Sequence, residues 1–142
     1  CAIVHDIGKI GVPDSIRQLH YNKPSHEMAI VKKHPEIGYN LLCHFPFLKV
    51  ESEAVYSEHE WYDGKGYPRG LAGNAISLYA RITAVADAFD AMRFDRVYHK
   101  GLPLKSVVSK ISAGSGSQFD PEVVKVFMNC YPELDALFAD SK

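Results

Sequence analysis

The sequence lacks the features that would place it at once among membrane, secreted or nucleic-acid-binding proteins. None of its apolar runs approaches the roughly 20 residues of a membrane-spanning helix, and no signal peptide is visible. Its 3 cysteines are widely spaced, which excludes a disulfide framework and a zinc-ribbon pattern. A net charge of -1 provides no field that would attract polymeric nucleic acid or an anionic membrane. We therefore expect a protein of the reducing cytoplasm.

The chain also lacks internal repeats, low-complexity tracts and any sustained strand alternation. Its 142 residues, of which 46% are hydrophobic, suffice for one domain with a real core. It has no starting methionine, and its first residues, CAIVHD, resemble the end of an apolar helix. We therefore expect a single domain over residues 1–142 that is truncated at its N-terminus.

Apolar side chains recur at helical spacing along most of the chain, which predicts an all-α fold. A break is expected near Pro35, because proline is disfavoured inside a helix and favoured in its first turn. The expected helices cover residues 25–43, 50–61, 77–93, 104–113, 121–130 and 132–140. A glycine- and proline-rich loop at 63–74 separates two of them, and such loops are often simple connections.

Several polar side chains occupy unexpected places in this helical pattern. The segment HDIGK at 5–9 lies among apolar residues, where charged groups are normally paired or bound to a ligand. Each residue alone has an ordinary explanation, such as a solvated helix face or a helix N-terminus. The whole set comprises His5, Asp6, Lys9, His34, Glu58, His59 and Asp87.

Taken together, the histidines and the carboxylates of this set form a ligand set for divalent first-row metals in a helical bundle. The adjacent His5 and Asp6 offer a terminal nitrogen ligand and a carboxylate able to bridge two ions. Two ions about 3.5–4 Å apart can hold a water-derived nucleophile between them and clamp a phosphodiester. Lys9 follows Asp6 by about one turn, where its ammonium could meet a phosphate oxygen. The pattern therefore indicates metal-assisted phosphodiester chemistry.

The order of several longer motifs resembles the HD-GYP domain family, bacterial all-helical metallophosphodiesterases that hydrolyse cyclic di-GMP. The motifs are HDIGKIGVPD, KKHPEIG, EHEWYDGKGYPRGL, ITAVADAFDAM and GSGSQFDPEVV, and they cover residues 1 to about 128. The resemblance implies a helical HD-domain bundle with C-terminal helices and with a loop around Gly66, Tyr67 and Pro68, called the GYP loop. It also implies upstream helices that complete the metal site and are absent from this sequence, so we expect residues 1–142 alone to show weak or no turnover of cyclic di-GMP.

The resemblance implies specific roles for residues of this chain. Asp6 and Lys9 would be catalytic, with Asp6 bridging the ions and Lys9 contacting the scissile phosphate. The implied metal ligands are His5, Asp6, His34, Glu58, His59 and Asp87, which would hold two or three ions of iron or manganese. The implied substrate-binding residues are Lys9, Gly66, Tyr67, Pro68, Arg96 and His99. The implied partners are cyclic di-GMP, an upstream input domain, and a diguanylate cyclase or other signalling protein at the GYP loop.

Two departures from the family pattern leave the activity open. Glu58 replaces the first histidine of the usual His-His-Glu, although a carboxylate also binds manganese or iron. His99 replaces a second cation and weakens a phosphate contact at neutral pH. We expect a phosphodiesterase that opens cyclic di-GMP. The alternatives are a degenerate nucleotide sensor or interaction module, in which Glu58 would point into solvent beside Glu60, and a hydrolase of another phosphate ester.

Overall fold

The computed structural model describes residues 2–17, 25–96 and 100–139, and within these ranges it contains helices and no strand. This confirms the all-α prediction. Ala2–Asp6 form turns rather than the expected helix end. The α-helices are α1 Asp14–Arg17, α2 Ser25–Val31, α3 His34–Leu42, α4 Lys49–Ser57, α5 Leu78–Arg93, α6 Leu104–Ala113 and α7 Pro121–Ala139. Three short 3-10 helices are η1 Ile7–Gly11, η2 Pro46–Leu48 and η3 Gly73–Ala75.

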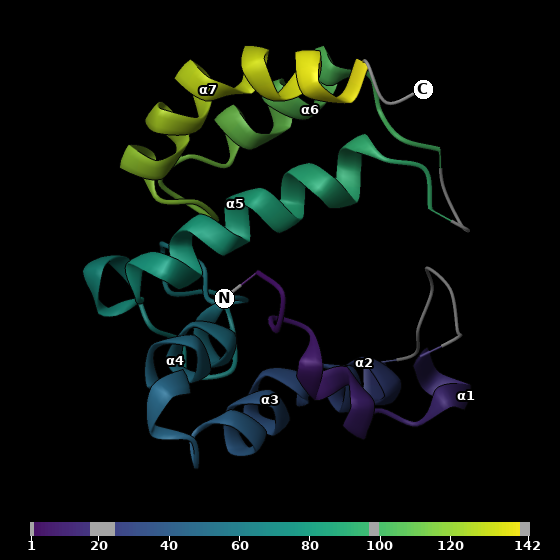
Figure 1. Ribbon diagram of the computed structural model, residues 1–142, viewed down its shortest axis with the longest axis vertical. Helices are drawn as coiled ribbons and strands as arrows, with labels where there is room; N and C mark the ends of the chain where they lie inside the picture. Colours follow the sequence, from purple (N-terminus) through teal and green to yellow (C-terminus); the bar gives the residue numbers. More distant parts are fainter. Residues whose placement is uncertain (1, 18–24, 97–99, 140–142) are drawn as a thin grey trace.

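Helix α5 lies in the middle of the molecule, with α3 and α4 below it and α6 and α7 above it in Figure 1. Its residues Val85 and Phe89 are four positions apart, so they share one face. They pack in an apolar core with Val107, Ile111 and Phe127 from α6 and α7. Asp87, between them in the sequence, instead lies 3.8 Å from Nε2 of His5 at the other side of α5, so one helix serves both halves of the fold.

A second contact brings the start of the chain against α3. The ideal Cβ of an alanine at Gly8 would lie only 1.9 Å from the carbonyl oxygen of His34, so only glycine allows η1 to approach this closely. Gly38 gives similar room on α3, where an added Cβ would lie 2.7 Å from Val55 Cγ1 of α4. These close approaches place the residues before η1 beside the first residue of α3.

Helix boundaries differ from the sequence expectation in two places. The expected helix 50–61 is wrong at its end, because α4 stops at Ser57 and a turn follows in which the N–H of Glu60 donates to the Ser57 carbonyl at 3.0 Å. The expected helices 121–130 and 132–140 form the single helix α7, which contains Pro132. Proline removes one helical hydrogen bond but leaves the other turns of a long helix in place. The break expected near Pro35 is confirmed, since α2 ends at Val31 and α3 begins at His34.

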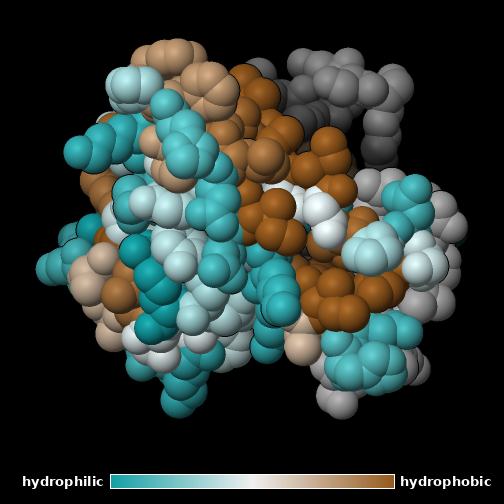
Figure 2. All heavy atoms as spheres, turned by 90° about the horizontal axis from the view of Figure 1, so that it is seen from below, coloured by the Kyte–Doolittle hydropathy of each residue, from teal (hydrophilic) through white to brown (hydrophobic). Residues whose placement is uncertain are grey.

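The surface of the molecule is mixed in character. Seen from below, apolar side chains gather toward the centre and right of the face, whereas its left side is largely hydrophilic (Figure 2). Among the helices that the structure describes, none combines the length and the apolar character needed to cross a membrane.

Candidate metal centre

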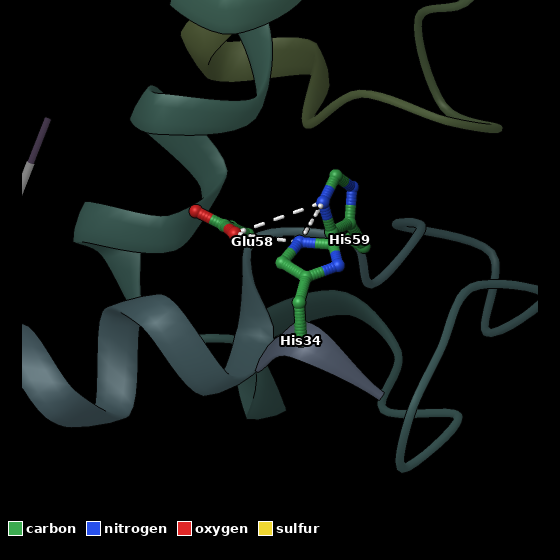
Figure 3. A group of neighbouring side chains, drawn as sticks. All are labelled: His34, Glu58 and His59. Carbon is green, nitrogen blue, oxygen red and sulfur yellow. Dashed lines mark hydrogen bonds and ion pairs between the residues drawn. The ribbon is translucent and has the colours of Figure 1, made fainter. Parts of the chain in front are cut away.

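Polar side chains from three separate segments meet beside α5. His34 begins α3, Glu58 and His59 follow the end of α4, and Asp6 directly precedes η1. Figure 3 shows His34, Glu58 and His59 pointing toward one another from these elements. The early end of α4 matters here, because Glu58 and His59 leave the helix in a turn and both reach the same centre.

Two of the histidines, His5 and His34, are each oriented by a hydrogen bond to a backbone carbonyl three residues earlier. Nδ1 of His34 lies 2.7 Å from the Val31 carbonyl oxygen, and Nδ1 of His5 lies 2.6 Å from the Ala2 carbonyl oxygen. A carbonyl can only accept, so each Nδ1 carries a proton and donates it. In the neutral ring, Nε2 is then the nitrogen with the free lone pair. This arrangement is typical of metal-binding histidines, whose second nitrogen is held by a hydrogen bond.

The most enclosed part of the centre consists of two imidazoles and one carboxylate. Nε2 of His34 lies 3.0 Å from Nε2 of His59, while Oε1 of Glu58 is 3.5 Å from the first nitrogen and 3.6 Å from the second. The side chain of His34 is 2% exposed and that of Glu58 is 3% exposed. One ligand atom from each residue lies within 4.8 Å of the other two.

Glu58 provides the test of whether this group fits a cation. Both of its carboxylate oxygens are buried and have no hydrogen-bond partner in the structure. Such a carboxylate is costly in a protein interior unless a positive group compensates it. Two histidine nitrogens and a carboxylate oxygen are also a donor set that divalent first-row metals accept. The residues present therefore fit a divalent metal ion.

Asp6 lies between the group of His34, Glu58 and His59 and the other two candidate ligands, His5 and Asp87. Its Oδ1 lies 3.8 Å from Nε2 of His34, and its Oδ2 lies 3.4 Å from Nε2 of His5. The same nitrogen of His5 is 3.8 Å from Oδ1 of Asp87 on α5. The structure thus brings the six sequence-predicted ligand residues together, with Asp6 between His34 on one side and His5 on the other.

The electrostatics of the centre follow from burial and from these neighbours. Burial raises the pKa of Glu58 above its usual value, with opposing effects from His34 and His5. Burial, followed by the charges of His34 and Lys9, lowers the pKa of His59 to about 4. His59 is therefore neutral at physiological pH, which is the form that binds metals.

The pKa values of the adjacent pair shift in opposite directions. The hydrogen bond to Asp6 raises the pKa of His5 to about 9, although burial opposes this shift. Burial alone would raise the pKa of Asp6, but hydrogen bonds from His5 and Lys9 outweigh it and hold that pKa well below its usual range. Asp6 is therefore ionised throughout the physiological range and available as a ligand.

Lys9 lies against the same carboxylate. Its Nζ donates to Oδ2 of Asp6 at 2.6 Å, and the two residues of this ion pair are three positions apart in the sequence. The Lys9 side chain is 43% exposed, so its ammonium faces solvent as well as the centre. A cation in this position can contact an anion that approaches the centre from solvent.

The GYP loop packs directly on the centre. The ring of Tyr67 stacks on that of His59, with centroids 5.0 Å apart and an interplanar angle of 13°. The Tyr67 N–H also donates to the His59 carbonyl at 3.0 Å. A Cβ added at Gly66 would lie 2.1 Å from the backbone nitrogen of Trp61, so the loop can run this close only with glycine there. Pro68, which follows Tyr67, is exposed.

The chemistry of Tyr67 reflects the acidic surroundings. Burial raises its pKa to about 12, and the charges of Glu58, Asp6 and Asp87 add to the shift. The phenol therefore stays protonated and keeps a proton to donate.

Glu60 holds the loop, a role that was not predicted from the sequence. This buried carboxylate accepts hydrogen bonds from the backbone N–H of Arg69 at 2.7 Å and of Leu71 at 3.0 Å. The signal available in the sequence was an acidic residue immediately before a glycine-rich loop, where backbone N–H groups often lack partners.

The remaining substrate candidates are not drawn into the centre. Arg96 donates to Asp90 at 2.9 Å, and both side chains are largely exposed. No contact between Arg96 and the candidate ligands occurs in the part of the chain that the structure describes. His99 lies outside the described residues.

A family model described as "HD domain" matches residues 1–123. The chain is 39% identical over 138 residues to the cyclic di-GMP phosphodiesterase response regulator RpfG of Xanthomonas campestris, with 96% of this chain and 36% of that protein covered. It is 38% identical over 143 residues to a cyclic di-GMP phosphodiesterase of Thermotoga maritima, with 99% and 39% covered. A 3'3'-cGAMP-specific phosphodiesterase 2 of Vibrio cholerae is 34% identical, with 96% and 26% covered.

The fold is also found among solved structures. A crystal structure of a cyclic GMP-AMP specific phosphodiesterase of V. cholerae superimposes with a TM-score of 0.63, at 23% identity over 78% of this chain and 25% of that chain. This likeness concerns the fold alone. The chain spans less than two fifths of the length of the relatives named here.

Proposed function

Because this chain belongs to the HD domain family, we propose that it is a metal-dependent phosphodiesterase that hydrolyses cyclic di-GMP. The match also confirms the resemblance to the HD-GYP family that its motifs indicate. The single observation that supports a metal centre is the buried Glu58 carboxylate, which faces His34 and His59 and has no hydrogen-bond partner. The names of the relatives support the substrate.

In this proposal, six residues hold two or three divalent ions, with iron or manganese as the metal. Divalent ions bound there would activate a water molecule and polarise the phosphodiester. Asp6 lies between the two parts of the centre, as a bridging ligand requires. The ligand residues are His5, Asp6, His34, Glu58, His59 and Asp87.

The other residues act on the substrate. Water adds to phosphorus, one P–O bond breaks, and the ribose oxygen that leaves takes up a proton. Lys9 contacts the reacting phosphate and stabilises the charge that develops on its oxygens. Gly66, Tyr67 and Pro68 border the nucleotide, while Arg96 and His99 remain predictions for phosphate or guanine contacts.

The orientation of Glu58 favours this proposal over the degenerate sensor. A degenerate site was expected to leave Glu58 in solvent beside Glu60, but Glu58 is 5% exposed and Glu60 is 3% exposed. Glu60 is occupied by the loop, whereas Glu58 faces the histidines. A cyclic GMP-AMP dinucleotide is a second candidate substrate, because one relative is named for it. An upstream input domain and a diguanylate cyclase partner at the GYP loop also belong to the proposal.

The test is hydrolysis by the purified protein, with the upstream helices that the resemblance implies included, loaded with Mn²⁺ or with Fe²⁺. Cyclic di-GMP and 3'3'-cGAMP are incubated separately, and linear products are separated by chromatography. We expect Asp6→Asn to lose bound metal and turnover, because Asp6 contacts both parts of the centre. Glu36→Gln, which neutralises an exposed carboxylate on α3, is the matched control and should retain both. A chain that binds metal and cyclic di-GMP without turnover would support the sensor, and a chain that binds no metal would contradict the centre.

A further inference from the structure

Lys32 borders the metal centre without belonging to it. It follows the last residue of α2, two positions before His34, and its side chain is exposed. Its Nζ lies over the ring of Tyr67, 4.9 Å from the ring centroid. Tyr67 in turn stacks on His59. An ammonium group is therefore held beside the GYP loop at the solvent side of the centre.

Within the described ranges, the charge of Lys32 is not neutralised by an ion pair, unlike the charges of the two other cations proposed to contact the substrate. Lys9 is paired with Asp6 at 2.6 Å, and Arg96 is paired with Asp90 at 2.9 Å. Among the residues that the structure describes, no carboxylate forms an ion pair with Lys32. Its contact with an aromatic face is weak at an exposed site and leaves the ammonium free to bind an anion.

The substrate class requires a second cationic position. A cyclic dinucleotide carries two phosphodiesters, and only one can react at the ions at a time. The other carries a full negative charge and must lie outside the ions, near a centre that already contains the carboxylates of Asp6, Glu58 and Asp87. A cation at the rim of the centre offsets this repulsion and attracts the substrate.

We propose that Lys32 binds the second, non-reacting phosphate of the cyclic dinucleotide. This inference rests on the proposed function, since it assigns a further contact to the same substrate. The lysine would move from the face of Tyr67 to the phosphate, a small displacement for a flexible four-carbon side chain. Lys32 then contributes to affinity and to the choice of a two-phosphate substrate, while Lys9 serves the reacting phosphate.

The experiment compares Lys32→Gln with Lys33→Gln in the Mn²⁺-loaded protein with its implied upstream helices included. Lys33 is the adjacent exposed lysine, so both variants remove one positive charge from the same segment. The substrates are cyclic di-GMP and bis(p-nitrophenyl) phosphate, which contains one phosphodiester and no second phosphate. We expect Lys32→Gln to raise KM for cyclic di-GMP about tenfold, the scale of one charge-assisted contact, with kcat nearly unchanged. Its kinetics on bis(p-nitrophenyl) phosphate should equal those of the wild type, and Lys32→Arg should recover most of the affinity.

Other outcomes overturn the inference. Equal losses on both substrates would mean that Lys32 acts through Tyr67 and His59, and an unchanged KM for cyclic di-GMP would mean that it makes no contact. Calorimetric binding of cyclic di-GMP to the Mn²⁺-loaded wild type separates the two proposals. Binding without turnover would contradict the hydrolase and leave Lys32 to be judged from the dissociation constants of the variants. A wild type that does not bind cyclic di-GMP would overturn both.

Discussion

The orientation of the Glu58 side chain could be determined only from the structure. The sequence identified Glu58 as an acidic replacement in a histidine position, but it left two orientations open. Residue 58 keeps helical backbone angles, so its carboxylate continues the face of α4 that meets His34. That orientation depends on how α4 packs against α3, which no composition pattern resolves.

Replacing this carboxylate should weaken metal binding. We expect Glu58→Gln to lower Mn²⁺ affinity at least about tenfold, the lower end of the loss seen even for groups that only hydrogen-bond to ligands. The metal-free variant should unfold at the same or a higher urea concentration, because a buried carboxylate without partners becomes a neutral amide. Metal titration and urea unfolding measure the two effects.

The reverse substitution tests the chemistry of the position. Glu58→His restores an imidazole and should shift preference from Mn²⁺ toward metals that favour nitrogen ligands, such as Zn²⁺. Competition between the two ions, followed by metal analysis, measures the shift. Unchanged metal selectivity in Glu58→His, together with unchanged Mn²⁺ affinity in Glu58→Gln, would place this carboxylate outside the coordination sphere.

Lys9 belongs to the residue scale as well. We expect Lys9→Ala to lower kcat about 10²–10³-fold, as for removal of one electrostatic donor, while bound metal is retained. Its ion pair with Asp6 is partly exposed, and such pairs contribute little to folding, so the free energy of unfolding should change little. Steady-state kinetics and metal analysis on one preparation check both statements. Loss of metal in this variant would show that Lys9 positions Asp6 instead of acting on phosphate.

At the scale of elements, periodicity predicted the helices better than their ends. The expected segments 77–93 and 104–113 agree with α5 and α6 within one residue, because long amphipathic runs carry a strong signal. The short elements η1 and α1 were not predicted, since four or five residues contain too little periodicity. The candidate ligands could be named because histidine and aspartate are unusual among apolar residues, whereas the loop that packs on them depends on contacts between distant segments.

The GYP loop offers a prediction at this scale. Glu60→Gln replaces one accepting oxygen by an NH₂ group that must face a backbone N–H of Arg69 or Leu71. We expect a loss of about 1–3 kcal/mol in the free energy of unfolding, the cost of a buried group without a partner. Glu53→Gln is the control, because the partly exposed Glu53 carboxylate pairs with the partly exposed guanidinium of Arg69 at 3.3 Å, and its neutralisation should cost less than about 1 kcal/mol. Equal costs for the two variants would show that Glu60 does not hold the loop.

At the scale of the whole molecule, α5 separates a half that contains the candidate metal centre from a half built on an apolar core. Ile111 is fully buried in the apolar core of α5, α6 and α7, so Ile111→Ala should cost about 2–5 kcal/mol of unfolding free energy. Mn²⁺ affinity of the folded variant should change little. Val55→Ala removes the methyl groups that fill the space between α4 and Gly38 of α3, close to the ligands, and should weaken Mn²⁺ binding as well as stability.

Urea unfolding and metal titration of both variants separate the two halves. If Ile111→Ala weakened Mn²⁺ binding as much as Val55→Ala does, the halves would act as one unit through Asp87 on α5. The single domain over residues 1–142 remains a prediction, which the cooperativity of these unfolding curves also tests.

The bonds that orient His5 and His34 have a consequence for the order of folding. Each joins a ring to a carbonyl only three residues earlier, so closing it requires the ordering of a very short loop. Such contacts form rapidly, whereas the approach of His59 to His34 closes a loop of 25 residues and comes at a higher entropic cost. The rings of His5 and His34 are thus oriented by their own turns before the segment with His59 docks. Metal added early in refolding therefore meets oriented nitrogen ligands, and we expect it to accelerate the docking of the α4 end.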